Sequence, residues 1–416
     1  MLLFILTVFG SSRQWAVLMA GSRGYNNYRH QADVFRIYNI LSERGFNKSN
    51  LILLAYNDVV SHRMNPYKGK VFSTSDHKNV YPGEHAIDYS GKEATAENFM
   101  RVLLGDTHNG RALETTEEDD IFIYYDDHGA PGLLCVPANN GPEIYTDHIA
   151  HTLSEMKKKK KFRNVFFVIE ACYSGSVARN ITIPGVFVIS AAGPTQSSYS
   201  AQWDEDLGTF RTNEFTQHFM KFILENPESP ILESVNYAAK STSRSHVSAY
   251  GDFKVAQRPI SSFLMKSQPV KVQNGEVGDE DNAVPNGIQT SQVFIEFIKR
   301  RLLKVQSDSE RSVLQDALER EQNRREISTQ TFMNIARRLD PNGGNYGDKF
   351  VENIQYDCYR AAIEGFRVFC GEIDEHELSK LQIFTHLCQN TDKATLLNEI
   401  RASCPSKKWR TEDLYF

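Results

Sequence analysis

Cys172 and His128 are two side chains whose chemistry suits covalent catalysis. A thiol attacks a carbonyl carbon only as the thiolate, and a nearby imidazole can take the thiol proton and later protonate the leaving amine. Gly129 and the backbone of Cys172 could supply N–H donors to a developing oxyanion, because a glycine lets a substrate carbonyl approach the main chain. The reaction that these residues predict is acyl transfer through a thioester.

The elements that must position these residues are strands of one sheet. Apolar runs begin near residues 15, 51, 120, 164 and 185, and each ends in small, acidic or glycine residues. The run at 165–169 lacks polar alternation, which is typical of a strand buried on both faces. Between the first two runs, residues 30–46 have helical spacing, with Gly45 as a C-terminal cap. Strand, helix, strand in this order predicts parallel pairing with helices on both faces.

Reactive side chains gather where three of these runs end. In an open parallel sheet the carboxyl ends of the strands meet at one edge, where ligands bind. We therefore expect the side chains that follow the first, third and fourth runs to lie close together, namely Asn27, Arg29, His30, Asp127, His128, Glu170 and Cys172.

Composition limits the possible classes of protein. The chain has 416 residues, 40% of them hydrophobic, so it can bury one large domain and a smaller one. Its net charge of −5 argues against nucleic acid as the main partner. Residues 1–12 are apolar and then small, which predicts a secretory signal, with a first buried strand as the alternative. No later apolar stretch reaches about 18 residues, so no membrane span is expected.

The chain is predicted to divide after residue 265. Residues 266–290 are polar, acidic and rich in Gly and Pro, which is typical of a linker. Residues 291–416 are predicted to be helical, and four cysteines fall in the last sixty residues. Two disulfides are expected there, with three pairings open. Zinc binding is the alternative, although no CxxC pair is present.

Four ordered motifs resemble the legumains, the asparaginyl endopeptidases of the caspase-like cysteine peptidase clan. These are NNYRHQAD at 26, YYDDHGAPG at 124, IEACYSGS at 169 and SSY at 197, within a resemblance that spans residues 14–265. The tail resembles the family's helical prodomain. The resemblance implies an α/β fold: a caspase-like, mostly parallel sheet with helices on both faces at 13–265, followed by an all-α activation peptide and prodomain at 291–416.

The resemblance also implies an activity and a set of roles. The protein would be a zymogen that cleaves peptides and proteins after Asn, and also Asp, at acidic pH in a lysosome-like or vacuolar compartment, or after secretion. Cys172 would be the nucleophile, His128 the general base and acid, and Asn27 the residue that orients the imidazole. Its own prodomain would be an intramolecular inhibitor. No cofactor and no metal are expected.

A specificity pocket and further roles follow from the same resemblance. An Arg or His donor would meet the substrate amide oxygen while a carboxylate accepts from its nitrogen, so an apolar guest would leave these groups unpaired. A buried ion network that stabilises the loop is the alternative. Asp127 matches a position where the family forms a succinimide linked to peptide ligation, and the disulfides would be Cys358–Cys388 and Cys370–Cys404. The pocket residues would be Arg29, His30, Glu170, Ser197, Ser198 and Asn213.

The sequence departs from the family pattern in three places. Asn213 stands where the family has Asp, so relaxed acceptance of Asp substrates is our hypothesis. Tyr173 replaces the usual Glu after the nucleophile, which weakens any inference about acid dependence. The usual autocleavage Asn falls near Gln306, a poor substrate. Maturation is therefore expected at one of the alternatives Asp308, Asn282, Asn286 and Asn323.

Three other functions fit parts of this pattern. The catalytic subunit of the glycolipid-anchor transamidase shares the Cys–His arrangement and the NYRH stretch, but it normally ends in a membrane span, whereas this sequence ends in KKWRTEDLYF. A peptide ligase would use the same acyl-enzyme, with an amine in place of water. A catalytically silent binding protein on a peptidase scaffold is the third, and the presence of Asn27, His128 and Cys172 argues against it.

Overall fold

The computed structural model describes residues 13–138, 140–264, 287–344, 346–347, 349–406 and 408–409. The predicted signal at 1–12 and the candidate cleavage residues Asn282 and Asn286 lie outside these ranges. Among the helices within them, none combines the length and the apolar character that crossing a bilayer requires.

A seven-stranded sheet forms the centre of the first part, in the order β12-β9-β8-β4-β1-β2-β3. Six strands run parallel, and only β12, which pairs with β9, runs antiparallel. The mostly parallel sheet is therefore confirmed, and all five apolar runs are strands. The bounds are β1 Gln14–Ala20, β2 Leu51–Ala55, β3 Tyr89–Ser90, β4 Asp120–Asp126, β8 Asn164–Glu170, β9 Val186–Ser190 and β12 Ser248–Gly251.

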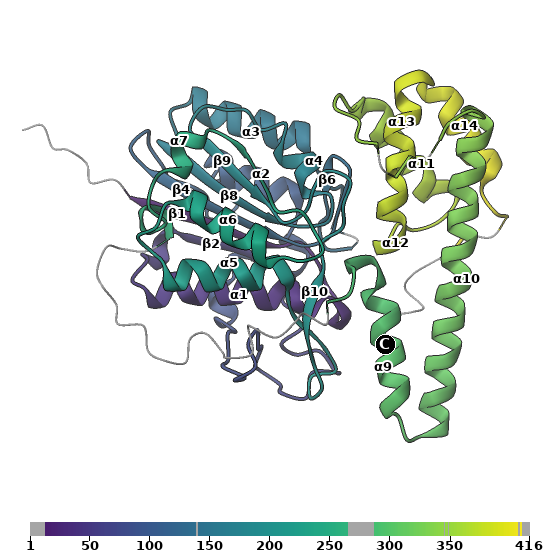
Figure 1. Cartoon of the computed structure of the whole chain (residues 1–416), viewed down its shortest axis with the longest axis horizontal. Helices are drawn as coiled ribbons and strands as arrows, with labels where there is room; N and C mark the ends of the chain where they lie inside the picture. The colour runs from purple at the N-terminus through teal and green to yellow at the C-terminus, as the bar shows by residue number, and fades with distance from the viewer. Residues whose placement is uncertain are drawn as a thin grey trace, which may run out of the picture.

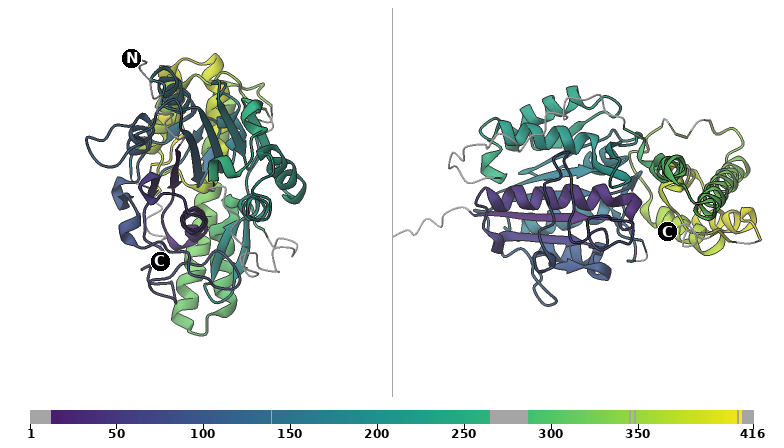
Figure 2. Two further views of the ribbon diagram at one scale, coloured as in Figure 1. Left: turned by 90° about the vertical axis from the view of Figure 1, so that its left-hand side faces the viewer. Right: turned by 90° about the horizontal axis from the view of Figure 1, so that it is seen from below.

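Helices cover both faces of this sheet (Figures 1 and 2). Alternate residues of each strand point to opposite faces. Phe122 and Tyr124 of β4 pack with α1 and α5, whereas Ile121 and Ile123 pack with α2 and α3. Neither face meets water, which explains the unbroken apolar runs. The helices are α1 Tyr28–Glu43, α2 Ala96–Leu104, α3 Thr146–Lys158, α4 Ser174–Ala178, α5 Glu214–Glu225, α6 Ile231–Ser241, α7 Phe253–Ala256 and α8 Ser261–Leu264.

Smaller strands lie at the edge where the parallel strands end. A three-stranded sheet contains β5 Gly129–Ala130, β6 Leu133–Leu134 and β7 Ile144–Tyr145. An antiparallel hairpin contains β10 Ser200–Asp204 and β11 Thr209–Asn213. Both carry residues that follow the main strands, so they help to build the site.

The second part is helical, as predicted, and lies beside the carboxyl edge of the sheet (Figure 1). The charged pattern from residue 292 is two helices rather than one, broken at 305–307. Phe294, Phe297 and Ile298 of the first helix join the core of the part that contains the seven-stranded sheet. The two disulfides are Cys358–Cys388 and Cys370–Cys404, the pairing that the resemblance implies. The helices are α9 Val293–Lys304, α10 Asp308–Leu339, α11 Tyr356–Phe369, α12 Glu375–Leu378, α13 Gln382–Asn390 and α14 Lys393–Ser403.

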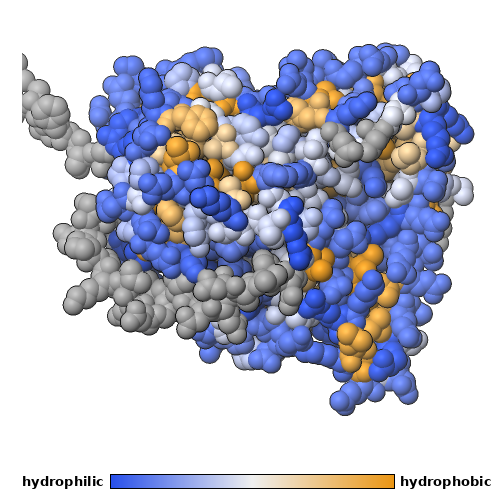
Figure 3. Space-filling view, viewed as in Figure 1, coloured by the Kyte–Doolittle hydropathy of each residue, from blue (hydrophilic) through white to orange (hydrophobic). Residues whose placement is uncertain are grey.

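The face drawn in Figure 3 is mainly hydrophilic, with apolar colour concentrated in a few places, including the α9–α10 hairpin. Leu303 on α9 is 86% exposed, and Val313 on α10 is also exposed. The inner side of the same hairpin is buried against the part that contains the seven-stranded sheet. Apolar packing therefore fixes the position of the helical part over the sheet edge.

Candidate active site

The sheet order brings the predicted reactive residues together. β8, β4 and β1 are neighbours, so the segments that follow them meet at one edge. His128 lies two residues beyond β4 and Cys172 two residues beyond β8. Both line one small cavity together with Gly129, Tyr173 and Ser197. The structure therefore places thiol and imidazole in one enclosure.

Cys172 sits on the sharp turn between β8 and α4. The next residue, Tyr173, has a φ of 57°, a left-handed conformation that L side chains seldom adopt. The thiol is 6% exposed, and its Sγ accepts the backbone N–H of Ser198 at 3.2 Å. Burial raises the pKa of the Cys172 thiol, although the Ser198 contacts act in the opposite direction. The resting thiol therefore keeps its proton until a base removes it.

His128 is held by residues from two distant segments. Its Nε2 lies 3.0 Å from Oδ1 of Asn27 and 3.1 Å from Oε1 of Glu375. Burial lowers the pKa of His128, but the carboxylates of Glu375 and Asp127 outweigh it, so the net shift is upward. Asn27 is where the resemblance expects the orienting residue. Glu375, from α12, carried no motif signal and was missed.

Gly129 allows the ends of β4 and β8 to touch. A Cβ atom built on Gly129 would lie 2.4 Å from the carbonyl oxygen of Cys172 and 3.2 Å from the Cβ of Ala171. The first distance is too short for any side chain, because the obstacle is backbone. Glycine is therefore required here for packing, in addition to the oxyanion role predicted from the sequence.

A buried polar cluster contains three of the predicted pocket residues. Nε of Arg29 donates to Oδ1 of Asn213 at 2.9 Å. The amide nitrogen Nδ2 of Asn213 donates to Asp126 at 3.0 Å and to Asp33 at 3.2 Å. These contacts fix which way the Asn213 amide points. Asp33 and Asp126 were not predicted as pocket residues. The carboxylate that the family has at position 213 is absent here, but the carboxylates of Asp33 and Asp126 lie next to that position.

Glu170 belongs to the same cluster and is only partly satisfied. Its Oε2 accepts from the backbone N–H of Thr216 at 3.2 Å and from the Thr216 hydroxyl at 3.0 Å. Its Oε1 and the Nη2 of Arg29 are buried, and neither finds a hydrogen-bond partner among the described residues. Burial raises the pKa of Glu170 to about 8. The cluster thus retains one unused donor and one unused acceptor.

His30 and the two serines are placed differently from one another. His30 faces away from the cluster: its Nδ1 lies 2.8 Å from Ser22 Oγ and 3.0 Å from Oδ1 of Asp127, and its ring meets His128 edge-on. Ser198 contacts the Cys172 thiol. Ser197 accepts a hydrogen bond from the Gln289 side chain at 2.8 Å.

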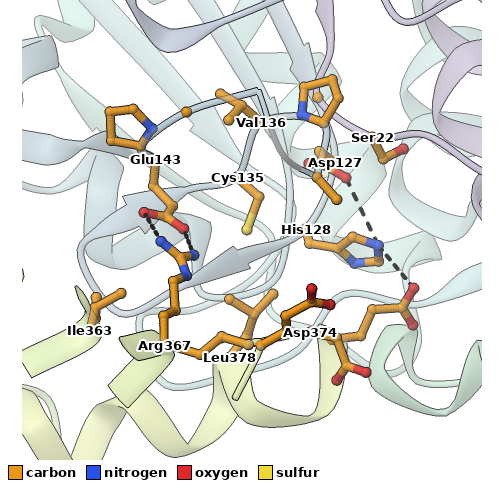
Figure 4. Close-up of a pocket in the computed structure, with 18 of the residues that line it drawn as sticks. Ser22, Asp127, His128, Cys135, Val136, Glu143, Ile363, Arg367, Asp374 and Leu378 are labelled. Carbon is orange, nitrogen blue, oxygen red and sulfur yellow. Dashed lines mark hydrogen bonds and ion pairs between the residues drawn. The ribbon is translucent and has the colours of Figure 1, made fainter. Parts of the chain in front are cut away.

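A larger cavity of about 690 Å³ opens beside His128, between the sheet edge and the helical part. Figure 4 shows the His128 ring beside Asp127 at this cavity, and Arg367 reaching Glu143 across it. The free Cys135 also lines it. The active-site edge is therefore bordered by residues of both parts of the chain.

Comparisons with known proteins found one family model and several similar proteins. Residues 14–274 match the model of the Peptidase C13 family. Over 379 residues the chain is 30% identical to a hemoglobinase of Schistosoma mansoni, covering 88% of this chain and 84% of that protein. It is 29% identical over 397 residues to a legumain of Rattus norvegicus, covering 91% and 89%. It is 27% identical over 443 residues to a vacuolar-processing enzyme beta-isozyme of Arabidopsis thaliana, covering 94% and 85%.

Proposed function

Because the chain belongs to the Peptidase C13 family and is a cysteine-type endopeptidase, we propose that it hydrolyses peptide bonds after Asn, and also after Asp, and that it is made as a zymogen. His128 takes the proton of Cys172, and the thiolate attacks the carbonyl carbon of the scissile bond. The imidazolium then protonates the leaving amine, and water resolves the thioester. Asn27 keeps the ring oriented during both proton transfers.

The unused donor and acceptor of the buried cluster carry the specificity proposal. A primary carboxamide offers one oxygen acceptor and an NH₂ donor. Its oxygen would accept from Nη2 of Arg29, and its nitrogen would donate to Oε1 of Glu170, two cluster atoms that have no partner among the described residues. An apolar side chain would leave both buried groups unpaired, which is costly. Below pH 8 the neutral Glu170 carboxyl could instead donate its proton to an Asp side chain.

The segment before α9 supports extended peptides as the substrate class. The N–H of Thr290 donates to the carbonyl of Ser198 at 3.1 Å, and the N–H of Ser200 donates to the carbonyl of Ile288 at 3.0 Å. Tyr199 and Gln289 face each other across this antiparallel bridge. Thr290 and Ser291 line the small cavity with Cys172. The end of the predicted linker thus lies where a substrate strand would pair by strand addition.

Contacts of the helical part support its role as an intramolecular inhibitor. The Glu375 carboxylate contacts Nε2 of the His128 imidazole, and Leu378 and Ser379 line the small cavity. Further ion pairs across the boundary are Arg367–Glu143, Arg360–Asp147 and Lys304–Glu205. In two of these three pairs the arginine comes from α11. The charged residues at 299–325 contribute less to this boundary, because Arg324 and Arg325 pair with Glu321 of their own helix.

Release of this inhibitor at low pH is part of the proposal. Protonation of carboxylates at the boundary would remove ion pairs that hold the helical part. An acidic lysosome-like or vacuolar compartment would supply that condition. The name of one relative, vacuolar-processing enzyme, agrees with such a location.

Acid incubation followed by peptide kinetics tests the proposal. The proenzyme and its Cys172→Ser variant are held at pH 4 to 5 and followed by intact mass. Initial rates are then measured on matched peptides with Asn, Asp or Ala at the cleavage position, and product masses separate hydrolysis from ligation. We expect loss of the tail and cleavage after Asn, and more slowly after Asp, only with Cys172 present. Equal rates on the Ala peptide would contradict the specificity assignment.

A further inference from the structure

Asp127 is a buried carboxylate whose surroundings do not satisfy it. Its side chain is 1% exposed, yet neither oxygen has a hydrogen bond of good geometry among the described residues. Buried polar groups without partners are rare and call for an explanation such as an unseen water or ion. Two imidazoles, those of His30 and His128, lie within 4.0 Å of its Oδ1, and the Tyr125 hydroxyl is a further neighbour.

The three side chains converge on one point. Oδ1 of Asp127 lies 3.0 Å from Nδ1 of His30 and 3.9 Å from Nε2 of His128, and the three ligand atoms all lie within 4.8 Å of one another. A zinc ion with ligands at about 2.1 Å in tetrahedral geometry separates its ligand atoms by about 3.4 Å. The two Asp127 contacts differ from that value by about 0.4–0.5 Å, whereas the two imidazole nitrogens, up to 4.8 Å apart, would have to approach each other by as much as about 1.4 Å.

We propose that His30, Asp127 and His128 form an inhibitory binding site for a zinc ion at the catalytic imidazole. Two imidazole nitrogens and one carboxylate oxygen are a ligand set that suits Zn²⁺, whereas Mg²⁺ and Ca²⁺ prefer oxygen ligands alone. In the proenzyme Glu375 supplies the fourth ligand, since its Oε1 lies 3.1 Å from Nε2 of His128. The ion then also ties α12 to the catalytic part.

The ion has a route to this site. Asp127, His128 and Glu375 all line the 690 Å³ cavity between the sheet edge and the helices (Figure 4). After removal of the helical part, water would replace Glu375 as the fourth ligand. The three remaining ligands come from α1 and from the end of β4, which are rigid elements.

The second His–Asp group among the described residues is less suited to a metal. It consists of His77, Asp204 and Asp206. Asp204 already faces the guanidinium of Arg211 at 3.3 Å and accepts the N–H groups of Asp206 and Leu207 at 2.9 Å. This group therefore serves as a built-in control for adventitious binding to surface histidine.

Zinc at this site would silence the peptidase, a consequence that rests on the proposed function. Coordination through Nε2 leaves the ring proton of neutral His128 on Nδ1, so neither nitrogen can accept the proton of Cys172. Removal of the zinc ion by a chelator restores His128 as the general base. The ion is thus a reversible inhibitor and takes no part in the chemistry.

Binding is tested without activity, in the proenzyme carrying Cys172→Ser, which removes the thiol as a ligand. Co²⁺ is titrated while its visible absorption is recorded, and Zn²⁺ stoichiometry is measured by equilibrium dialysis. We expect one ion per chain with the intense bands of four-coordinate cobalt. Asp127→Asn and His30→Gln should weaken binding by at least about 10-fold, whereas His77→Gln should not.

Several outcomes would overturn the site. These are unchanged affinity in both Asp127→Asn and His30→Gln, loss of binding in His77→Gln, or adventitious binding only, seen as many weak ions per chain. Asp127→Asn conserves shape, so an unchanged melting temperature shows that any lost binding is not unfolding. A wild-type chain that binds the ion but cleaves no peptide even after acid activation and removal of the ion by a chelator would contradict the proposed function and leave the metal site standing.

Discussion

Replacing Thr290 by Asn should turn the segment at 288–290, which pairs with Ser198 and Ser200 as a substrate strand would, into a substrate. Thr290 pairs with Ser198 and, with Ser291, lines the cavity of Cys172. If this strand follows the direction of a substrate, an Asn side chain at 290 would meet the buried cluster. It would supply one hydrogen bond to Arg29 and one to Glu170, the two groups with unused atoms.

The magnitude follows from those two bonds. The bond to the Arg29 guanidinium contributes about 1.5–3 kcal/mol, and the bond to Glu170, which is neutral at pH 5 because its pKa is about 8, contributes about 0.5–1.5 kcal/mol, so the pair is worth about 2–4.5 kcal/mol. That corresponds to roughly a 30- to 2,000-fold increase in the rate of cleavage between residues 290 and 291. The neighbouring Gln289→Asn variant is the matched control, because the Gln289 side chain bonds to Ser197 instead.

Intact mass after incubation at pH 5 reads out the cut. The Thr290→Asn chain should divide after residue 290, at a rate independent of protein concentration, and the same chain with Cys172→Ser should stay whole. Suppose instead that wild type releases its tail under these conditions while Thr290→Asn shows no cut at 290. The strand would then not lie in the substrate direction, and our reasoning about the pocket would be wrong.

Three further outcomes are expected. Burial raises the pKa of Glu170 from 4.5 to about 8, so the folded chain loses stability as pH rises between these values. Glu170→Gln should reduce that loss by roughly 1–3 kcal/mol, as measured by denaturant titrations. Gly129→Ala, whose Cβ would strike the Cys172 carbonyl oxygen, should lower kcat/KM by about 10²-fold, as measured after titration of active thiols. Asp308→Ala should slow tail release in timed gels, whereas Asn323→Ala should not, because Asp308 is exposed at the start of α10 and Asn323 lies within that helix.

The sequence predicted the sheet well because its strands are buried on both faces. Such strands read as unbroken apolar runs, and the motifs at their ends mark the carboxyl edge. The edge strands β3 and β12, of two and four residues, have no comparable run and were not predicted. The break between α9 and α10 was also missed, since Val305 and Gln306 interrupt a helical pattern without a proline or glycine.

The sequence did not predict which residues from distant parts of the chain contact the site. Glu375 meets His128 from 247 residues away in the chain, and no motif marks it. The segment at 288–290 forms one isolated bridge, between Gln289 and Tyr199, and a 3-10 helix begins at Thr290. It was taken as the end of a linker because only contacts with distant residues give it structure. His30 was predicted beside Arg29 in the pocket, yet consecutive residues of a helix point about 100° apart. Arg29 reaches Asn213, and His30 reaches Asp127.

Covalent labelling by a peptide electrophile tests the central claim most directly. Two peptides with a thiol-reactive group, one with Asn and one with Ala at the cleavage position, are reacted with the acid-activated chain. Peptide mapping then compares the two free thiols, Cys172 and Cys135. We predict that the Asn probe labels Cys172 at least about 10²-fold faster than the Ala probe does. We also predict that the Asn probe labels Cys172 faster than Cys135, and that His128→Ala abolishes this second preference. Labelling of Cys135 and Cys172 at similar rates, or equal labelling by both probes, would contradict the account.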